Sequence, residues 1–129
     1  DALFCGDTLF SLGCGRMFEG SPEQMWNSLK LLRCLPDETI VYCAHEYSLS
    51  NSFFAIEIDP DNKFLQKKVE EVREKRKHRI PTIPTLLGEE KKTNPFLRVD
   101  DKSFTKKLGF YDKIDYEIFA KIRLMKDNF

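Results

Sequence analysis

Two side chains that bind metal ions in many enzymes follow two short apolar runs of the sequence. Asp7 follows residues 2–5 after one glycine, and His45 follows residues 39–43 after one alanine. In open α/β layers, ligand sites gather at the carboxyl ends of the strands, and divalent ions accept mixed imidazole and carboxylate ligands. We therefore expect Asp7 and His45 to converge as metal ligands or as a general base. The alternatives are a turn-capping role for Asp7 and a structural hydrogen bond for His45.

Two cations stand near the end of the chain. Arg123 and Lys126 lie three residues apart, on one face of a predicted last helix. Positive charge at a helix C-terminus is favourable to the helix dipole. The same pair would also suit a clamp for a carboxylate, which arginine holds through two parallel hydrogen bonds. Their spacing does not decide between the two roles.

The first third of the sequence predicts an α/β unit that would position Asp7 and His45. Residues 2–5 and 39–43 are apolar and predict two buried strands. Between them Ser21 is a good N-cap, with proline next and Gln24 three residues on, so we expect a helix that Pro36 ends. Met25, Leu29 and Leu32 repeat along it at helical spacing.

The rest of the sequence predicts helices. Residues 61–79 have one apolar face among charged residues, made by Phe64, Leu65, Val69 and Val72. Prolines require residues 80–85 to be extended, residues 94–97 form a turn, and residues 115–127 predict a closing helix. Glutamates alternate with the lysines and arginines of residues 67–79. This pattern is typical of a solvated helix face rather than of nucleic-acid binding.

Composition excludes several classes of protein. The 129 residues carry 21 Lys+Arg and 21 Asp+Glu, so net charge favours no polyanionic partner such as nucleic acid. No apolar run has the length of a membrane span, and no signal peptide begins the sequence. The four cysteines form no CxxC pair, so we expect reduced, mostly buried thiols and no zinc knuckle. We expect a cytoplasmic protein, with a mitochondrial location as the alternative.

Six motifs together give the sequence a family resemblance that covers essentially all of its residues. They occur in this order: Gly6-Asp7-Thr8-Leu9-Phe10, Gly13-Cys14-Gly15-Arg16, Phe18-Glu19-Gly20, His45-Glu46-Tyr47, Asn94-Pro95-Phe96-Leu97-Arg98, and Arg123 with Lys126-Asp127. The sequence closely resembles the C-terminal half of the glyoxalase II (hydroxyacylglutathione hydrolase) family, which has the metallo-β-lactamase fold. Each motif is moderately specific, and the ordered set is strongly so.

The resemblance implies a thioester hydrolase with two metal ions. By that likeness Asp7 bridges the ions and His45 binds one of them, so these two residues would be both metal ligands and catalytic residues. The ions would be Zn²⁺, with iron or manganese as alternatives. A metal-bridging hydroxide would attack S-D-lactoylglutathione and release D-lactate and glutathione, because two metals lower the pKa of the bridging water and stabilise the oxyanion.

The same resemblance implies a glutathione site and a divided architecture. The glutathione contacts carried over from the family are Arg16, Tyr47, Asn51, Arg123 and Lys126, with Phe18 where some members have tyrosine. The implied fold is α/β, namely the second half of an αββα metallo-β-lactamase sandwich followed by a helical substrate-binding region. The expected domains are residues 1–58 and residues 59–129.

One family motif has no counterpart in this sequence. The family's HxHxDH ligands precede its GDTLF motif, whereas no HxH occurs here. We therefore expect a fragment that is inactive alone and that self-associates through exposed sheet surface. The alternatives are a non-catalytic glutathione-binding module and another hydrolase of the metallo-β-lactamase fold.

Overall fold

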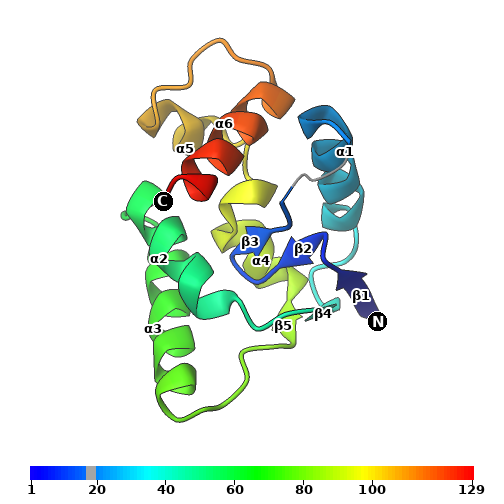
Figure 1. The fold of residues 1–129 in the computed structure, drawn as a ribbon, viewed down its shortest axis with the longest axis vertical. Helices are drawn as coiled ribbons and strands as arrows, with labels where there is room; N and C mark the ends of the chain where they lie inside the picture. Colours follow the sequence, from blue (N-terminus) through cyan, green and yellow to red (C-terminus); the bar gives the residue numbers. More distant parts are fainter. Residues whose placement is uncertain (17–19) are drawn as a thin grey trace.

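The computed structural model describes residues 1–16 and 20–129, which form a mixed α/β fold (Figure 1). The strands are β1 (Ala2–Gly6), β2 (Leu9–Phe10), β3 (Gly13–Cys14), β4 (Ile40–Cys43) and β5 (Thr85–Leu86). The helices are α1 (Pro22–Arg33), α2 (Ser48–Ile58), α3 (Lys63–Lys77), α4 (Leu87–Thr93), α5 (Lys102–Lys107) and α6 (Asp115–Asp127), with a 3-10 helix η1 (Pro95–Leu97). None of the helices in the described part of the chain is long and apolar enough to cross a membrane.

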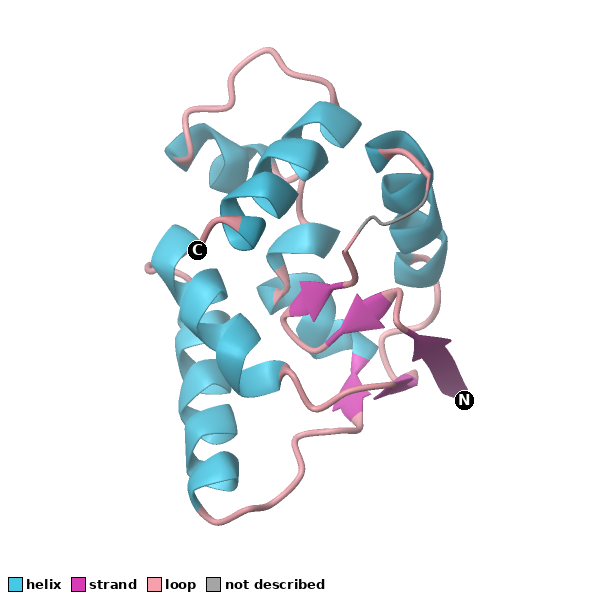
Figure 2. Cartoon of the chain, in the orientation of Figure 1, coloured by secondary structure: helices cyan, strands magenta, loops and turns pink. Residues whose placement is uncertain are grey.

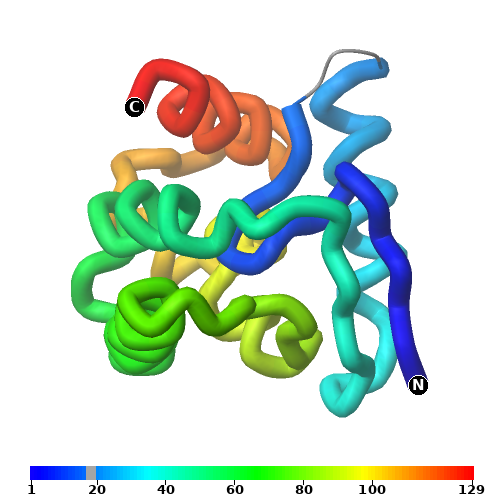
Figure 3. The backbone as a smooth tube through the Cα atoms, turned by 60° about the horizontal axis from the view of Figure 1, so that its bottom comes forward, coloured from blue at the N-terminus to red at the C-terminus, as the bar shows by residue number. Residues whose placement is uncertain are grey.

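A three-stranded sheet brings together the first strand and two strands from later in the chain (Figure 2). Its order is β1-β4-β5, with β1 parallel and β5 antiparallel to β4. Figure 3 shows β1, in dark blue, running beside the cyan segment that contains β4. Because parallel strands have their carboxyl ends at the same edge of a sheet, the residues after β1 and β4 leave the sheet together.

The expectation that the first two predicted strands are buried is wrong. β1 is at the edge of the sheet, and its side chains alternate between exposed and half-buried, with Phe4 77% exposed. Ile40 and Tyr42 of β4 are also exposed, on the face that carries Phe4, and Tyr42 stacks on Phe4 with ring centroids 5.0 Å apart. An apolar run does not distinguish a strand covered on both faces from one covered on a single face.

Helix α1 begins as the sequence predicts. The Ser21 hydroxyl accepts from the Gln24 N–H and the Gln24 side chain accepts from the Ser21 N–H, which together form a capping box. The helix ends at Arg33, before the predicted stop at Pro36. Arg33 then donates two hydrogen bonds of 2.7 Å to Asp100, so the end of α1 is attached to the segment after η1.

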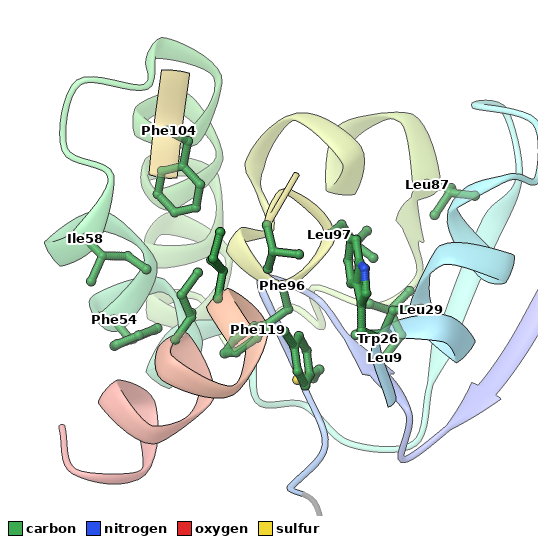
Figure 4. Packing of buried hydrophobic residues seen from close by; sticks show 14 of the residues in the cluster. Leu9, Trp26, Leu29, Phe54, Ile58, Leu87, Phe96, Leu97, Phe104 and Phe119 are labelled. Carbon is green, nitrogen blue, oxygen red and sulfur yellow. The ribbon is translucent and has the colours of Figure 1, made fainter. Parts of the chain in front are cut away.

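The main core lies between α1, α2, η1 and α6 and is rich in aromatic side chains (Figure 4). Phe119 of α6 packs edge-on against Phe96 at 5.9 Å and stacks on Trp26 at 6.4 Å. A smaller cluster joins α2, α3 and the turn between β2 and β3, and its buried members are Leu12, Ala55, Leu65, Val69 and Val72. Both clusters fix the helices around the β2–β3 hairpin.

Two further expectations need correction. Phe64 was expected on the buried face of the helix at residues 61–79, but it is 60% exposed and lies under the Lys92 ammonium at 4.8 Å. The cysteines are free thiols but not mostly buried, because only Cys14 is buried while Cys34 is exposed. Helical spacing alone places Phe64 at the border of the apolar face, where a cation can cover it instead of the core.

Candidate functional site

One cavity of about 530 Å³ adjoins most of the residues that the sequence singled out. It lies between the ends of β1 and β4, the β2–β3 hairpin, the first turn of α2 and the last turn of α6. Its lining residues are Asp7, Phe10, Cys14, Gly15, Arg16, His45, Tyr47, Ser50, Asn51, Arg123 and Lys126. Phe18, the remaining predicted contact, lies outside the described residues.

Asp7 and His45 meet at one end of the cavity. His45 Nε2 is 3.1 Å from Asp7 Oδ1, and both side chains are well exposed, at 48% and 75%. The His45 ring stacks on the Tyr47 ring at 4.8 Å and 15°. Phe10 packs edge-on against Tyr47 at 5.1 Å, which fixes the other side of this aromatic group. The arrangement orients the imidazole while leaving the carboxylate accessible.

Two glycines determine where Asp7 stands. Gly6 has a φ of 52°, a backbone conformation that L side chains rarely adopt, at the register shift between β1 and β4. Gly15 lies so close to Asp7 that a Cβ atom there would be 2.0 Å from the Asp7 carbonyl oxygen. The Gly15 N–H also donates to the Thr8 carbonyl at 3.2 Å. The glycine-rich loop therefore packs directly on the turn that carries Asp7.

Glu46, next to His45 in the sequence, points away from the cavity. Its carboxylate accepts hydrogen bonds from the Thr82 N–H and hydroxyl, and Arg76 lies 3.9 Å away. The Thr82 hydroxyl also pairs with the Ser48 hydroxyl at 2.6 Å. Glu46 thus ties the turn that carries His45 to the extended segment after α3. Its role is positional.

Another part of the cavity lining is cationic. Arg123 is nearly buried, and its Nη1 donates to the Cys14 carbonyl at 2.8 Å. Its Nε donates to Asp127 Oδ1 at 3.1 Å, and its Nη2 lies 2.8 Å from the same oxygen in an ion pair. Figure 3 shows the segment after β3 passing beside α6, the two elements that these bonds connect. Arg123 therefore fastens the glycine-rich loop to the last helix while its guanidinium borders the cavity.

Lys126 and Arg16 complete this cationic end. Partial burial lowers the pKa of Lys126, and the positive charges of Arg123 and Arg16 lower it further. Arg16 is 64% exposed, with its Nε 3.8 Å from Asp127 Oδ1. Two arginines whose charges lower the pKa of Lys126 favour an anionic ligand between these cations, because such a ligand relieves their repulsion.

Asn51, predicted as a glutathione contact, holds the hairpin. It is 7% exposed, and its Nδ2 donates to the Ser11 carbonyl at 3.1 Å. A Cβ atom at Gly13 would be 2.5 Å from that nitrogen, so α2 approaches the hairpin closely. Asn51 therefore lines the cavity while the NH₂ group of its side-chain amide is hydrogen-bonded to the hairpin backbone.

The surroundings of the Cys14 and Cys43 thiols make these two groups poor nucleophiles. Burial raises the pKa of the Cys14 thiol to about 12. The Cys43 thiol is hydrogen-bonded to Cys5, which lowers the pKa of Cys5 and, together with burial, raises that of Cys43. Cys5, Cys14 and Cys43 are strand residues, and none of them forms a thiol–imidazole pair with His45.

Sequence reasoning missed Glu90, a residue that supports the hairpin lining the cavity. It is fully buried, and its carboxylate accepts from the Leu12 N–H at 2.8 Å and from the Ser11 hydroxyl at 3.1 Å. The Asn94 amide donates to it at 3.2 Å and also to the Phe10 carbonyl at 3.1 Å. Glu90 fixes the hairpin whose ends carry Phe10 and the glycine-rich loop. Its only sequence signal is an acidic residue within an α4 that the sequence did not predict.

The metal-binding capacity of the chain is partial. Asp7 and His45 offer one carboxylate and one imidazole at the same point, which suits zinc, iron or manganese. Within residues 1–16 and 20–129, no group of three or more His, Cys, Asp and Glu side chains could hold an ion. Since catalytic zinc sites use three protein ligands, these residues fit part of a metal centre and not a whole one.

Comparison with known proteins gives a consistent match. Residues 46–129 match the family model described as hydroxyacylglutathione hydrolase C-terminus. The chain is 57% identical over 127 residues to a hydroxyacylglutathione hydrolase of Bartonella henselae, covering 98% of this chain and 50% of the relative. It is 53% identical over 128 residues to the protein of that name from Methylococcus capsulatus, covering 99% and 50%. The chain therefore spans about half the length of the curated relatives that it matches.

Proposed function

Because the chain belongs to the hydroxyacylglutathione hydrolase family, we propose that it is the glutathione-holding part of a thioester hydrolase and contributes two ligands to its metal centre. The observation that carries this proposal is that one cavity is lined both by the carboxylate–imidazole pair and by Arg16, Arg123 and Lys126. A thioester of an anionic tripeptide requires a metal centre at its acyl carbon and cations at its carboxylates.

The proposed substrate is S-D-lactoylglutathione, and the products are D-lactate and glutathione. Lys126 and Arg16 hold the carboxylates of the tripeptide, and Arg123 keeps the glycine-rich loop in place beside them. Tyr47 and Asn51 border the middle of the bound ligand, and Phe18 is proposed as a further contact. Asp7 and His45 are the proposed metal ligands. Two metal ions, proposed to be Zn²⁺ with iron or manganese as alternatives, supply a water of lowered pKa and polarise the thioester carbonyl.

We further propose that the sheet is part of a metallo-β-lactamase sandwich, with residues 1–58 in the sandwich and residues 59–129 in the substrate-binding region. The support is the bare apolar face of the sheet, formed by Phe4, Ile40, Tyr42 and Leu86. In the longer relatives, the part that this chain does not span would cover that face. The remaining metal ligands would come from the same part.

The bare sheet face predicts that this chain self-associates. Exposed aromatic surface beside the unpaired edge of β1 favours contact between copies. Sedimentation should therefore show the apparent mass rising with protein concentration, and the replacement Phe4→Ser should reduce that rise. Tyr111→Ser is the matched control, because Tyr111 is 62% exposed in the segment between α5 and α6. A wild-type chain that stays monomeric at every concentration would contradict this proposal.

Glutathione binding tests the proposed function directly. Calorimetric titration of the chain with glutathione, without added metal, should give saturable binding. Lys126→Gln should weaken it about tenfold, since a hydrogen bond between two charged groups is lost. Lys107→Gln removes the same charge from a 59% exposed lysine on α5 and should have no effect. Absence of glutathione binding to the folded chain would reject the proposed function.

A second candidate function is a glutathione-binding module without catalysis. The observation in its favour is that the cationic end is complete within this chain, whereas the metal end has two ligands. Metal titration separates the two candidates. If a complete protein of this family containing these residues binds glutathione but no metal, the binding module is the better description.

A further inference from the structure

Asp127 stands where a negative charge is unfavourable for its own helix. It is the last residue of α6, and the C-terminal end of a helix dipole repels a carboxylate. The helix dipole therefore does not account for Asp127. Its side chain is 38% exposed, so solvent is available to it without a partner.

The carboxylate of Asp127 instead contacts the cations that line the cavity, from outside the cavity. Its Oδ1 accepts from Arg123 Nε at 3.1 Å, lies 2.8 Å from Arg123 Nη2 in an ion pair, and lies 3.8 Å from Arg16. Asp127 itself is not among the residues that line the cavity. It also raises the pKa of its neighbour Lys126, against the lowering effects of burial and of the two arginines. One negative charge thus acts on all the cations at this end.

A carboxylate in this place has two opposite effects on an anionic ligand. Its hydrogen bonds orient Arg123, which helps binding, while its charge reduces the positive potential in the cavity, which opposes binding. The orienting effect has a substitute, because Nη1 of Arg123 is already held by the Cys14 carbonyl. The charge effect has no such substitute, since the one carboxylate among the described residues that line the cavity, that of Asp7, pairs with His45. The charge effect should therefore be the larger one.

We propose that Asp127 is an affinity-limiting residue, which weakens the hold of Arg16, Arg123 and Lys126 on an anionic ligand. The consequence for turnover rests on the proposed function. Glutathione is then a product that must leave, and binding that is equally strong for substrate and product lowers KM without raising kcat. By limiting that binding, Asp127 speeds product release. It is a positioning and tuning residue rather than a catalytic one.

Asp127→Asn tests the proposal because asparagine keeps an oxygen that accepts from Arg123 and removes only the charge. NMR titration of the chain with glutathione, followed at the Gly15 and Lys126 amides, should show binding about fivefold tighter than in the wild type, and less so at high salt. Inorganic sulfate, a probe independent of the proposed function, should also bind more tightly. Asp61→Asn is the matched control, since Asp61 is 78% exposed and lies near Lys107, away from this cavity.

The outcomes separate this proposal from the proposed function. Tighter binding of both probes in Asp127→Asn, with no change in Asp61→Asn, supports it. If sulfate binds more tightly but glutathione binds to neither protein, Asp127 limits affinity as proposed and the proposed function fails. If Asp127→Asn binds sulfate equally or more weakly while its unfolding midpoint is unchanged, the orienting effect dominates and the proposal is overturned. Asp127→Ala, which also removes the hydrogen bonds, should keep most of the gain, because the Cys14 carbonyl still holds Arg123.

Discussion

Glu90→Ala should lower the free energy of unfolding by about 3–5 kcal/mol, because it removes a buried anion and leaves its partners unpaired. The Leu12 N–H and the Ser11 hydroxyl would lose their acceptor inside the protein. So would the Thr85 hydroxyl, which donates to Glu90 at 3.0 Å, and the Asn94 amide. Glu90 thus joins the hairpin to β5 and to Asn94, the N-cap of η1. A loss of this size is a large share of the about 5–15 kcal/mol typical of a domain.

The buried lysine beside Glu90 should contribute little to this effect. Lys68 Nζ lies 3.8 Å from Glu90 and donates to Glu89 at 2.9 Å. Without Glu90, Lys68 keeps one carboxylate partner, so the ammonium is not left alone. Most of the loss should therefore come from the hairpin contacts. Glu90→Gln keeps the shape and should cost less than Glu90→Ala.

Urea unfolding followed by circular dichroism measures the Glu90 effect. Glu57→Ala is the matched control, because Glu57 is exposed on α2 and surface substitutions usually change stability by less than about 0.5 kcal/mol. The hairpin carries one wall of the cavity, so Glu90→Ala should also weaken glutathione binding. A change in unfolding free energy similar to that of Glu57→Ala would contradict the role given to Glu90.

Asp7→Ala should reduce kcat/KM for S-D-lactoylglutathione by more than about a hundredfold, since loss of even an outer-shell partner of a metal costs about 10–100-fold. The protein suited to this assay is a chimera in which the first half of the Bartonella henselae protein is followed by this chain. Asp7 is 75% exposed and its side chain meets only His45 among the described residues. In the metal-free chain, its removal should therefore leave the unfolding midpoint unchanged.

Metal content gives Asp7→Ala a second readout. Elemental analysis of the purified chimera should show less bound metal in Asp7→Ala than in the wild type. Asp61→Ala, a similarly exposed aspartate, should change neither metal content nor rate. Full metal content and full activity in Asp7→Ala would remove Asp7 from the proposed metal centre.

Sequence signals that are local predicted the structure well. The capping box at Ser21 and Gln24 and the apolar spacing of residues 115–127 correspond to α1 and α6. The contact between Asp7 and His45 also agrees with the expectation that the ends of two parallel strands meet. Their role as metal ligands stays a prediction, as do the glutathione contacts.

Structure that depends on tertiary packing was missed. Helix α2 has no side-chain cap at Tyr47 and buries serine and asparagine as well as Phe54 and Ile58, so it has no polar face to identify it. It is stabilised by packing on α3 and on the hairpin. Glu90 was missed for the same reason, because its donors come from residues as far away as Ser11 in the sequence. The exposed edge position of β1 likewise depends on which strands are its neighbours.

Hydrolysis of S-D-lactoylglutathione by the metal-loaded wild-type chimera tests the central claim most directly. The claim is that this chain holds the glutathione part of the substrate and supplies Asp7 and His45 to the metal centre. The predicted result is release of D-lactate and glutathione with kcat/KM in the usual enzymatic range of about 10⁴–10⁸ M⁻¹s⁻¹. A folded chimera that contains its metal, binds glutathione and does not hydrolyse the thioester would contradict the account.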